Sequence, residues 1–288
     1  MKPELTVGMC VKNAQSTIKE TVESVLAQDY QPDLVETIVV DGNSSDATLS
    51  IIRNLMLHAR TTCRIYSDDS RGLGYARQTV VNNARGRYIV FVDSDVVIRK
   101  DFLRRQIEFM DANRRVGIGL GRYMYKEGNW LSSAWNLYHS TMQDFVGCAF
   151  ICRCDAVRSV GGFDPKIKGA GEDVDLIARM QSRGWLAAMS ERAEFFHNYR
   201  ATLSGFWSEH SWFGYGGYYL ALKNQRLFSP SRNLPPGKLI HGLRTASKAY
   251  SSTRRKISFL IPPLLLFGNM AWWTGFLKAV IQRYGHEG

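Results

Sequence analysis

The sequence predicts an α/β protein with a mostly parallel central sheet and flanking helices. Its 288 residues are enough for one large α/β domain with a substantial core. The hydrophobic content of 45% and the charged content of 22% are those of an ordinary folded chain. Short apolar runs alternate with helical patterns along the first third of the chain, and that alternation is typical of parallel β-α units.

The first two units occupy the N-terminal sixth of the chain. An apolar run at 5–11 predicts a strand, and apolar residues on one face of 18–26 predict a helix. A second strand over 34–40 ends in the polar turn 41–46, which caps the next helix.

The alternation continues with a strand at 63–66, a helix over about 72–84 and a strand at 88–92. Parallel sheets bind ligands at the carboxyl ends of their strands. Five acidic residues fall at those ends: Asp41, Asp68, Asp69, Asp93 and Asp95. The second half of the chain is less regular. Strands are expected at 116–123 and 147–152 and a helix at 172–183, and 200–222 is rich in aromatic residues.

The net charge of +11 lies entirely in the C-terminal quarter, where residues 210–286 carry eleven Lys or Arg and no Asp or Glu. Within it, the run 257–277 has no charged residue, follows three consecutive cations and contains paired tryptophans. This pattern favours an anionic membrane surface as partner. As a helix the run would be about 30 Å long, which is enough to cross a bilayer.

Pro262 and Pro263 lie inside that run, and each lacks the N–H that a continuous helix needs. We therefore expect a broken helix that lies in the membrane interface or dips into it. A hairpin packed on the rest of the protein is the alternative.

The cysteines favour a reducing compartment, because their number is odd and no N-terminal signal peptide precedes them. No second cluster at zinc-finger spacing accompanies the group near residue 150, so the thiols are interpreted as buried or incidental. The five are Cys10, Cys63, Cys148, Cys152 and Cys154.

Asp93 and Asp95 directly follow the apolar strand 88–92, which predicts that both carboxylates reach the ligand edge. Hard divalent cations that bridge phosphates take oxygen ligands of this kind. Such acidic pairs also cap helices, and the segment 101–110 is a helix candidate that follows.

Four motifs in order, at 39–48, 74–95, 161–164 and 171–179, resemble family 2 inverting glycosyltransferases of the GT-A fold. The resemblance covers roughly residues 5–200. It implies a Rossmann-like catalytic domain and a nucleotide-diphosphate sugar as donor, with a UDP-sugar favoured. Beyond about residue 225 the sequence resembles the membrane-associated members of the family only in its general character.

By this resemblance, Val11, Asn13 and Asp41 would hold the nucleotide base, and Arg77 would lie near the base or the diphosphate. Cys10 and Lys12 depart from the family pattern and leave the base identity open. For Asp41 the alternative is a turn-former in an Asp-Gly pair. For Arg77 it is a solvated helix face.

The resemblance also assigns a divalent metal, Mn²⁺ or Mg²⁺. Asp95 would ligate it, Asp93 would bind the ribose or the metal through water, and His197 would be a third ligand. A structural role for His197 is the alternative.

Glu172 and Asp173 open the predicted helix 172–183, whose N-terminus favours ionised carboxylates. The resemblance implies that Asp173 is the general base of a single displacement with inversion. Glu172 would bind the acceptor or orient the base. Plain helix-capping acids are the alternative.

His210 and Trp212 belong to an aromatic and glycine-rich stretch that could form an acceptor-side wall, since aromatic rings stack on sugars and glycines allow close approach. A tryptophan and tyrosine belt at a lipid interface is the alternative. The same two interpretations apply to Trp130 and Trp135.

These observations predict a catalytic domain over 1–222, with a nucleotide-binding half (1–95) and an acceptor-binding half (96–222), and basic, apolar membrane-associating helices over 223–288. The expected function is transfer of a sugar to a lipid-linked or membrane-proximal glycan acceptor at the cytoplasmic face of a membrane. A soluble polysaccharide or protein acceptor is an alternative.

Two non-enzymatic alternatives are a basic scaffold and a nucleic-acid-binding protein. The second is disfavoured because no nucleic-acid-binding module is recognised. An NAD-binding oxidoreductase is excluded because no G-x-G-x-x-G motif follows the first strand.

Overall fold

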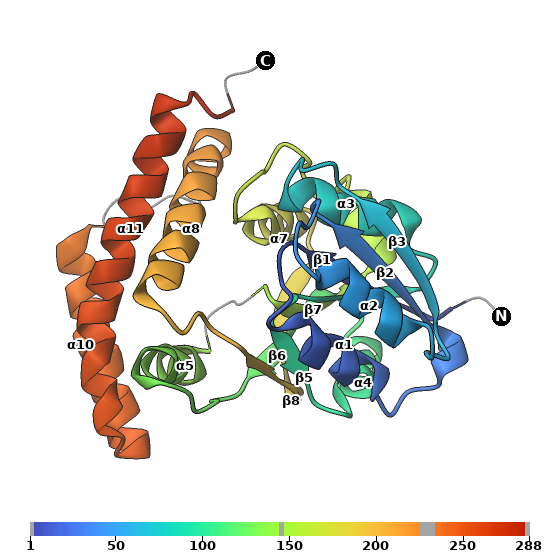
Figure 1. Ribbon diagram of the computed structural model, residues 1–288, viewed down its shortest axis with the longest axis horizontal. Coiled ribbons are helices and arrows are strands. Elements are labelled where there is room, and N and C mark those ends of the chain that lie inside the picture. Colours follow the sequence, from blue (N-terminus) through green and yellow to red (C-terminus); the bar gives the residue numbers. More distant parts are fainter. Residues whose placement is uncertain (1–2, 144–146, 225–233, 286–288) are drawn as a thin grey trace. The chain divides into compact units, whose positions relative to one another are not determined.

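The computed structural model describes residues 3–143, 147–224 and 234–285 (Figure 1). The chain divides into two compact units. The first unit comprises residues 1–123, 145–168 and 172–198, and the second comprises 124–144, 169–171 and 199–288.

The first half of unit 1 alternates strands and helices as predicted: β1 (Leu5–Val11), α1 (Ile18–Leu26), η1 (Pro32–Leu34), β2 (Val35–Asp41), α2 (Thr48–Met56), β3 (Thr62–Ser67), α3 (Leu73–Asn83) and β4 (Tyr88–Val92). The four strands are parallel, and Leu5 in the central β1 lies opposite both Val35 and Tyr88. Their order, β3-β2-β1-β4, reverses the direction of chain progression beside β1. Ligands of open α/β sheets bind at such a reversal.

The second half of unit 1 adds β5 (Val96–Ile98), α4 (Phe102–Ala112), β6 (Val116–Tyr123), β7 (Ala149–Arg153), α6 (Cys154–Ser159), α7 (Glu172–Ser182) and β8 (Leu186–His197). The sheet has eight strands in the order β3-β2-β1-β4-β7-β6-β8-β5. Strands β7 and β5 run against their neighbours, so the sheet is mixed in this half. The predicted α/β fold class is confirmed.

Helices cover both faces of the sheet. Helices α3, α6 and α7 share one hydrophobic cluster with the strands, which includes Val80, Phe91, Phe150 and Leu176. Helix α4 lies on the other face, where a side chain at Gly121 would collide with Phe102. Figure 1 shows α1, α2 and α4 along that side. All five cysteines are free thiols, and Cys148, Cys152 and Cys154 are buried.

Unit 2 contains α5 (Trp130–Met142), α8 (Leu203–Lys223), α10 (Pro235–Thr253), η3 (Lys256–Leu260) and α11 (Ile261–Ile281). Its core joins Trp135, Phe206, Ala249 and Leu264 from four of these helices. In Figure 1, α11 runs between α8 and α10.

The compact units do not follow the predicted boundary at residue 222. Helices α5 and α8, which we placed in the acceptor-binding half (96–222), group with the C-terminal helices instead. The physical reason is the shared apolar core, in which Trp135 and Phe206 pack against residues of α10 and α11. The functional assignment of 1–222 and 223–288 stays a prediction.

The expected break in the apolar run is wrong. Pro262 and Pro263 occupy the first turn of α11, and the helix continues unbroken to Ile281. In the first turn a missing N–H removes no intrahelical hydrogen bond, so both prolines are tolerated there. Within the described residues, 256–281 is the one stretch long and apolar enough to cross a membrane, and it is partly buried inside the protein.

Helices α8 and α11 approach each other closely because glycines face the contact. A Cβ at Gly275 would collide with the carbonyl oxygen of Ser211, and one at Gly214 with that of Trp272. A Cβ at Gly217 would also collide with the Trp272 ring. Gly214 and Gly217, which the acceptor-wall interpretation took as allowing close approach of a sugar, thus contact α11, and Gly216 of the same stretch meets the backbone of Ala170.

This contact predicts whether an alanine at position 275 raises or lowers the free energy of unfolding. Gly275→Ala would normally raise helix stability by up to about 1 kcal/mol. Because the added methyl meets the backbone of Ser211, we expect a loss of about 1–3 kcal/mol instead. Urea denaturation measures the change, with Thr274→Ala at the exposed neighbouring position as control. A stabilised Gly275→Ala protein would contradict the close contact.

Candidate active site

The loops after β1 and β2 are tied together around Asp41. Its carboxylate accepts hydrogen bonds from the backbone N–H of Ser44 (3.0 Å) and from the Ser44 hydroxyl (2.6 Å). The backbone N–H of Asn13 donates to the same hydroxyl oxygen (3.0 Å), and the Asn13 side chain accepts from the N–H of Ser45 (2.9 Å). Asp41 is thus a turn-former here, and its role toward a nucleotide base stays a prediction.

Val11 and Asp68 lie on either side of Asp41. The Val11 side chain is buried and its carbonyl accepts the Gly42 N–H (2.8 Å). Asp68 is also buried and accepts from the N–H of Ser70 (2.7 Å), whereas Asp69 is exposed. Of these strand-end residues, Val11 and Asp68 shape the loops and Asp69 faces solvent.

Arg77 joins three segments that are distant in sequence. Its guanidinium contacts the Asp93 carboxylate (2.9 Å), the carbonyl oxygen of Gly147 (3.0 Å) and the Glu172 carboxylate (2.6 Å). Arg77 is only 2% exposed, so the alternative of a solvated helix face is wrong. The cation links the end of β4, the residues before β7 and the start of α7.

Aromatic rings surround the same guanidinium. Its Cζ atom lies 5.5, 5.1 and 5.9 Å from the ring centroids of Phe91, Phe150 and Phe163. Phe163 reaches this place because Gly161 and Gly162, with φ of 82° and 75°, turn the chain after α6 in a conformation that favours glycine. The motif at 161–164 therefore supplies one wall of the Arg77 pocket.

The charges in this cluster alter one another's pKa values. Burial lowers the pKa of Arg77, but Glu172, Asp93 and Asp173 outweigh it, so the net shift is upward and the cation is retained. Burial raises the pKa of Glu172, and Arg77 opposes that rise. The same burial raises the pKa of Asp93, Arg77 again opposes it and the neighbouring Asp95 adds to it.

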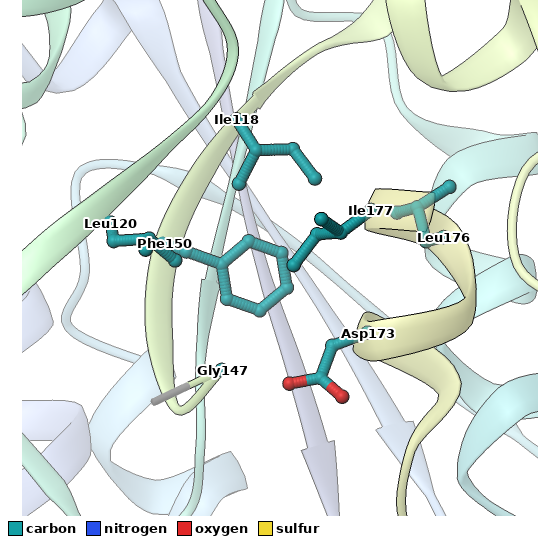
Figure 2. Close-up of a pocket in the computed structure, with 7 residues that line it drawn as sticks. All are labelled: Ile118, Leu120, Gly147, Phe150, Asp173, Leu176 and Ile177. Carbon is teal, nitrogen blue, oxygen red and sulfur yellow. The ribbon is translucent and has the colours of Figure 1, made fainter. Parts of the chain in front are cut away.

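Asp173 lies at the rim of a small pocket in unit 1 (Figure 2). Its Oδ1 accepts the N–H of Val174 (2.8 Å), and a Cβ at Gly147 would collide with its Oδ2. The absence of a side chain at 147 thus allows the carboxylate to stand where Figure 2 shows it, beside the Phe150 ring. The remaining lining residues are apolar: Ile118, Leu120, Leu176 and Ile177.

Asp95 and His197 face each other at the edge where β5 meets β8. Val96 pairs with His197 across the two strands, and the His197 Nε2 lies 3.1 Å from the Asp95 Oδ1. Two ligands at about 2.1 Å on adjacent positions of an octahedral ion are about 3 Å apart. One carboxylate and one imidazole at this separation fit a shared divalent cation, with other positions left for phosphate oxygens.

Asp93 has a different partner from this pair, since its Oδ1 contacts Arg77. Across residues 3–143, 147–224 and 234–285, no group of three or more His, Cys, Asp or Glu side chains is arranged to hold a metal ion. Of the three predicted metal ligands, Asp95 and His197 therefore form a close pair, and Asp93 lies beside them with Arg77 as its partner.

The two acceptor-side candidates have different surroundings within unit 2. His210 is buried, its Nδ1 lies 2.8 Å from the Phe206 carbonyl oxygen, and its ring stacks on that of Phe206 (4.0 Å). Trp212 is 39% exposed. Trp135 is buried beside His210 and Trp130 is half exposed. Their roles toward an acceptor stay predictions.

Sequence reasoning missed two features of the site. The Arg77–Glu172 ion pair joins residues 95 positions apart, and no local pattern announces it. Gly147 was taken only as the start of a strand, although it contacts both Arg77 and Asp173. A glycine directly before an apolar strand was the single available signal.

Two family models match the chain. The model of Glycosyl transferase family 2 matches residues 6–159, and that of Glycosyl transferase family group 2 matches residues 88–281.

Similar proteins include the succinoglycan biosynthesis protein ExoO of Rhizobium meliloti, 39% identical over 110 residues, which are 38% of this chain and 30% of ExoO. The UDP-Glc:alpha-D-GlcNAc-diphosphoundecaprenol beta-1,3-glucosyltransferase WfaP of Escherichia coli is 37% identical over 110 residues, 38% of this chain and 42% of WfaP. The match thus spans less than half the length of either relative.

Among solved structures, the mannosyltransferase PcManGT of Pyrobaculum calidifontis, in complex with GDP-Man and Mn²⁺, superposes with a TM-score of 0.67 at 18% identity. The alignment covers 98% of this chain and 88% of that one. At this identity the likeness concerns the fold.

Removal of the buried cation should destabilise unit 1. Arg77→Met leaves the buried carboxyl of Glu172 and the carboxyl of Asp93 without their partner, and we expect a loss of about 3–5 kcal/mol of unfolding free energy. Arg104→Met, at a partly exposed pair with Asp29, should cost no more than about 1 kcal/mol. Urea denaturation compares them, and the double variant Arg77→Met/Glu172→Met should recover part of the loss. Equal stability of Arg77→Met and the parent would refute this role.

The second unit should lose stability in mild acid through His210. Burial lowers the pKa of His210 to about 4 from 6.5, so the neutral ring is stabilising above pH 6.5 and that contribution is lost as the pH falls toward 4. The loss is about 3 kcal/mol when complete. His210→Phe should flatten this part of the stability profile in urea denaturation between these pH values. His58→Phe, at an exposed position, should leave the slope unchanged, and an unaltered slope in both variants would count against the assignment.

Proposed function

The chain belongs to glycosyl transferase family 2, and on that premise we propose that it transfers a sugar from a nucleotide-diphosphate donor, with a UDP-sugar favoured, to a lipid-linked or membrane-proximal acceptor at the cytoplasmic face of a membrane. The transfer is a single displacement that inverts the anomeric carbon. The observation that carries the proposal is the position of Asp173 at a pocket rim, linked through Arg77 to Asp93 at the end of β4.

The donor site is proposed at the loops that follow β1, β2 and β4. Asn13 and Asp41 hold these loops in a fixed arrangement through Ser44, and this preorganisation supports their assignment to the nucleotide base. The Val11 side chain is buried, so its contribution would come from its backbone.

Arg77 is assigned a positioning role instead of a direct contact with the diphosphate. Its charge is already shared between Glu172 and Asp93, and the side chain is buried. Glu172 is equally buried, so it too acts by orienting the start of α7 and not by contacting the acceptor.

A divalent cation, Mn²⁺ or Mg²⁺, is proposed between Asp95 and His197, with Asp93 beside them. The 3.1 Å separation of the two side chains and their oxygen and nitrogen donors support this assignment. When bound, such an ion offsets the negative charge that gathers on the departing diphosphate.

Asp173 is proposed as the general base. Its carboxylate takes the proton of the acceptor hydroxyl while the hydroxyl oxygen forms a bond to the anomeric carbon. The bond from that carbon to the diphosphate oxygen breaks on the opposite side, and the nucleoside diphosphate leaves. The apolar residues beside Asp173 belong to the buried core of the sheet, so they would keep water away from that side of the carboxylate.

The acceptor class rests on two observations. WfaP, as its name states, glucosylates a GlcNAc carried on diphosphoundecaprenol, which is a membrane lipid. The second is the basic and apolar composition of the C-terminal quarter. Together they favour a lipid-linked acceptor over a soluble polysaccharide or a protein.

The test is release of nucleoside diphosphate from UDP-, GDP- and dTDP-sugars, with a membrane lipid extract as acceptor and with or without Mn²⁺. Asp173→Asn should lower the turnover number about 10²–10⁴-fold, the usual value of general-base assistance. Asp155→Asn is a matched control, because Asp155 also accepts the next N–H in the first turn of a helix (2.8 Å) and is exposed.

Turnover that needs Mn²⁺ and is lost only in Asp173→Asn supports the proposal. Equal activity of the two variants would refute Asp173 as the base. Turnover with a soluble glycan and none with lipid extract would move the acceptor to the soluble class. No release from any donor by folded protein would favour the non-enzymatic scaffold.

A further inference from the structure

Helix α10 exposes an apolar stripe. Leu239, Ile240 and Leu243 are 39%, 51% and 56% exposed, whereas Ala246 and Ala249 of the same helix are buried. Three large aliphatic side chains on one outward helix face are unusual for a surface that meets only water.

Helix α11 repeats the arrangement. Met270, Leu277 and Ile281, spaced by seven and four residues, lie on one face and are 60%, 54% and 80% exposed. The opposite face of α11 contains Gly268 and Gly275, which pack against α8. Among the described residues this outward face stays exposed from Met270 to Ile281, and its polar members are Thr274 and the cation Lys278.

Cations accompany these stripes, and no acidic residue lies between 210 and 286. At the junction of α10 and η3, Phe259 is 59% exposed and packs against Tyr250 at 5.1 Å. The exposed cations of this region are Arg244, Lys248, Arg254, Arg255 and Lys256. Arg255 also lies 4.0 Å from the exposed carboxylate of Glu127, so at least four of these cations carry the excess charge of the region. Outward apolar side chains next to an excess of cations match a surface that is both apolar and anionic.

We propose that the outward faces of α10 and α11 rest on the surface of an anionic phospholipid bilayer, and that α11 does not cross it. Crossing would take α8, whose backbone packs against α11 at Gly275, into the bilayer as well, and within the described residues α8 is not apolar enough to cross. A nucleic acid would account for the cations and leave the apolar stripes unexplained. This inference deepens the proposed function by naming the surface that reaches the membrane, and it rests on that function only for the location of the acceptor.

The direct test is co-flotation of the full chain with phosphatidylcholine vesicles that contain or lack phosphatidylglycerol. We expect binding to the anionic vesicles. The variants Ile240→Glu/Leu243→Glu and Met270→Glu/Leu277→Glu should each bind at least roughly tenfold more weakly, because buried apolar side chains are replaced by charges that lipid repels. Leu57→Glu, at a leucine in unit 1 that is 76% exposed, is the matched control and should float like the parent.

A separate variant tests the contribution of the cations to vesicle binding. Replacing Arg254, Arg255 and Lys256 by Gln should weaken binding by about five-fold per cation, or roughly 10²-fold together. Binding should also fall as salt is added, because salt screens surface charge. Equal flotation with neutral vesicles, or binding of an oligonucleotide without binding of vesicles, would overturn the proposal.

Extraction of membranes with alkaline carbonate separates a surface protein from a spanning one. We expect release into the supernatant, and retention in the membrane pellet would show that α11 crosses. The two proposals fail separately. Flotation without sugar-nucleotide turnover would support the membrane-binding surface and refute the proposed enzymatic activity. Turnover on a soluble acceptor by protein that does not float would support the activity and refute the membrane-binding surface.

Discussion

The arrangement of the site depends on one buried cation. Arg77 contacts the carboxyl groups of Glu172 and Asp93 at once, and through the Gly147 carbonyl it fixes the segment that enters β7. A buried ion pair is weak evidence of net stabilisation, because desolvation of both charges opposes their attraction. Its lasting effect is geometric. The first turn of α7, which carries Asp173, is set against the end of β4 by a contact that has few alternative arrangements.

The sheet explains why such a bond is needed. Strands β1 to β4 are parallel and deliver their carboxyl ends to one edge, but β7 is antiparallel to β4 and presents its beginning there. The residues around Asp173 therefore reach the edge from a different part of the chain, after a long irregular connection. Aromatic rings from β4, β7 and the turn at 161–164 fill the space beneath the guanidinium, so that the charge is held from every side.

The sequence predicted the first half of unit 1 well, because β1 and β4 are apolar runs with clear ends, and because Asp41 ends β2 and Asp93 follows β4. It failed where tertiary contacts decide the local structure. Strand β8 was not predicted, because polar residues near Ser190 interrupt its pattern, and α8 was not predicted, because its glycines resemble a loop. Pro262 and Pro263 suggested a break, although a first turn tolerates both. Arg77 and Glu172 could not be paired without knowing the sheet order.

Gly147 has a consequence for any redesign of the pocket beside Asp173. The Oδ2 of Asp173 occupies the place that a Cβ at 147 would take, so this wall of the pocket has no side chain that can be trimmed, and any added atom pushes the carboxylate away. The other lining residues, by contrast, are mostly buried in the core of the sheet, and among them only the aliphatic Ile177 is partly exposed. A change in the shape of the cavity that leaves both the core and the carboxylate in place therefore has to start from Ile177.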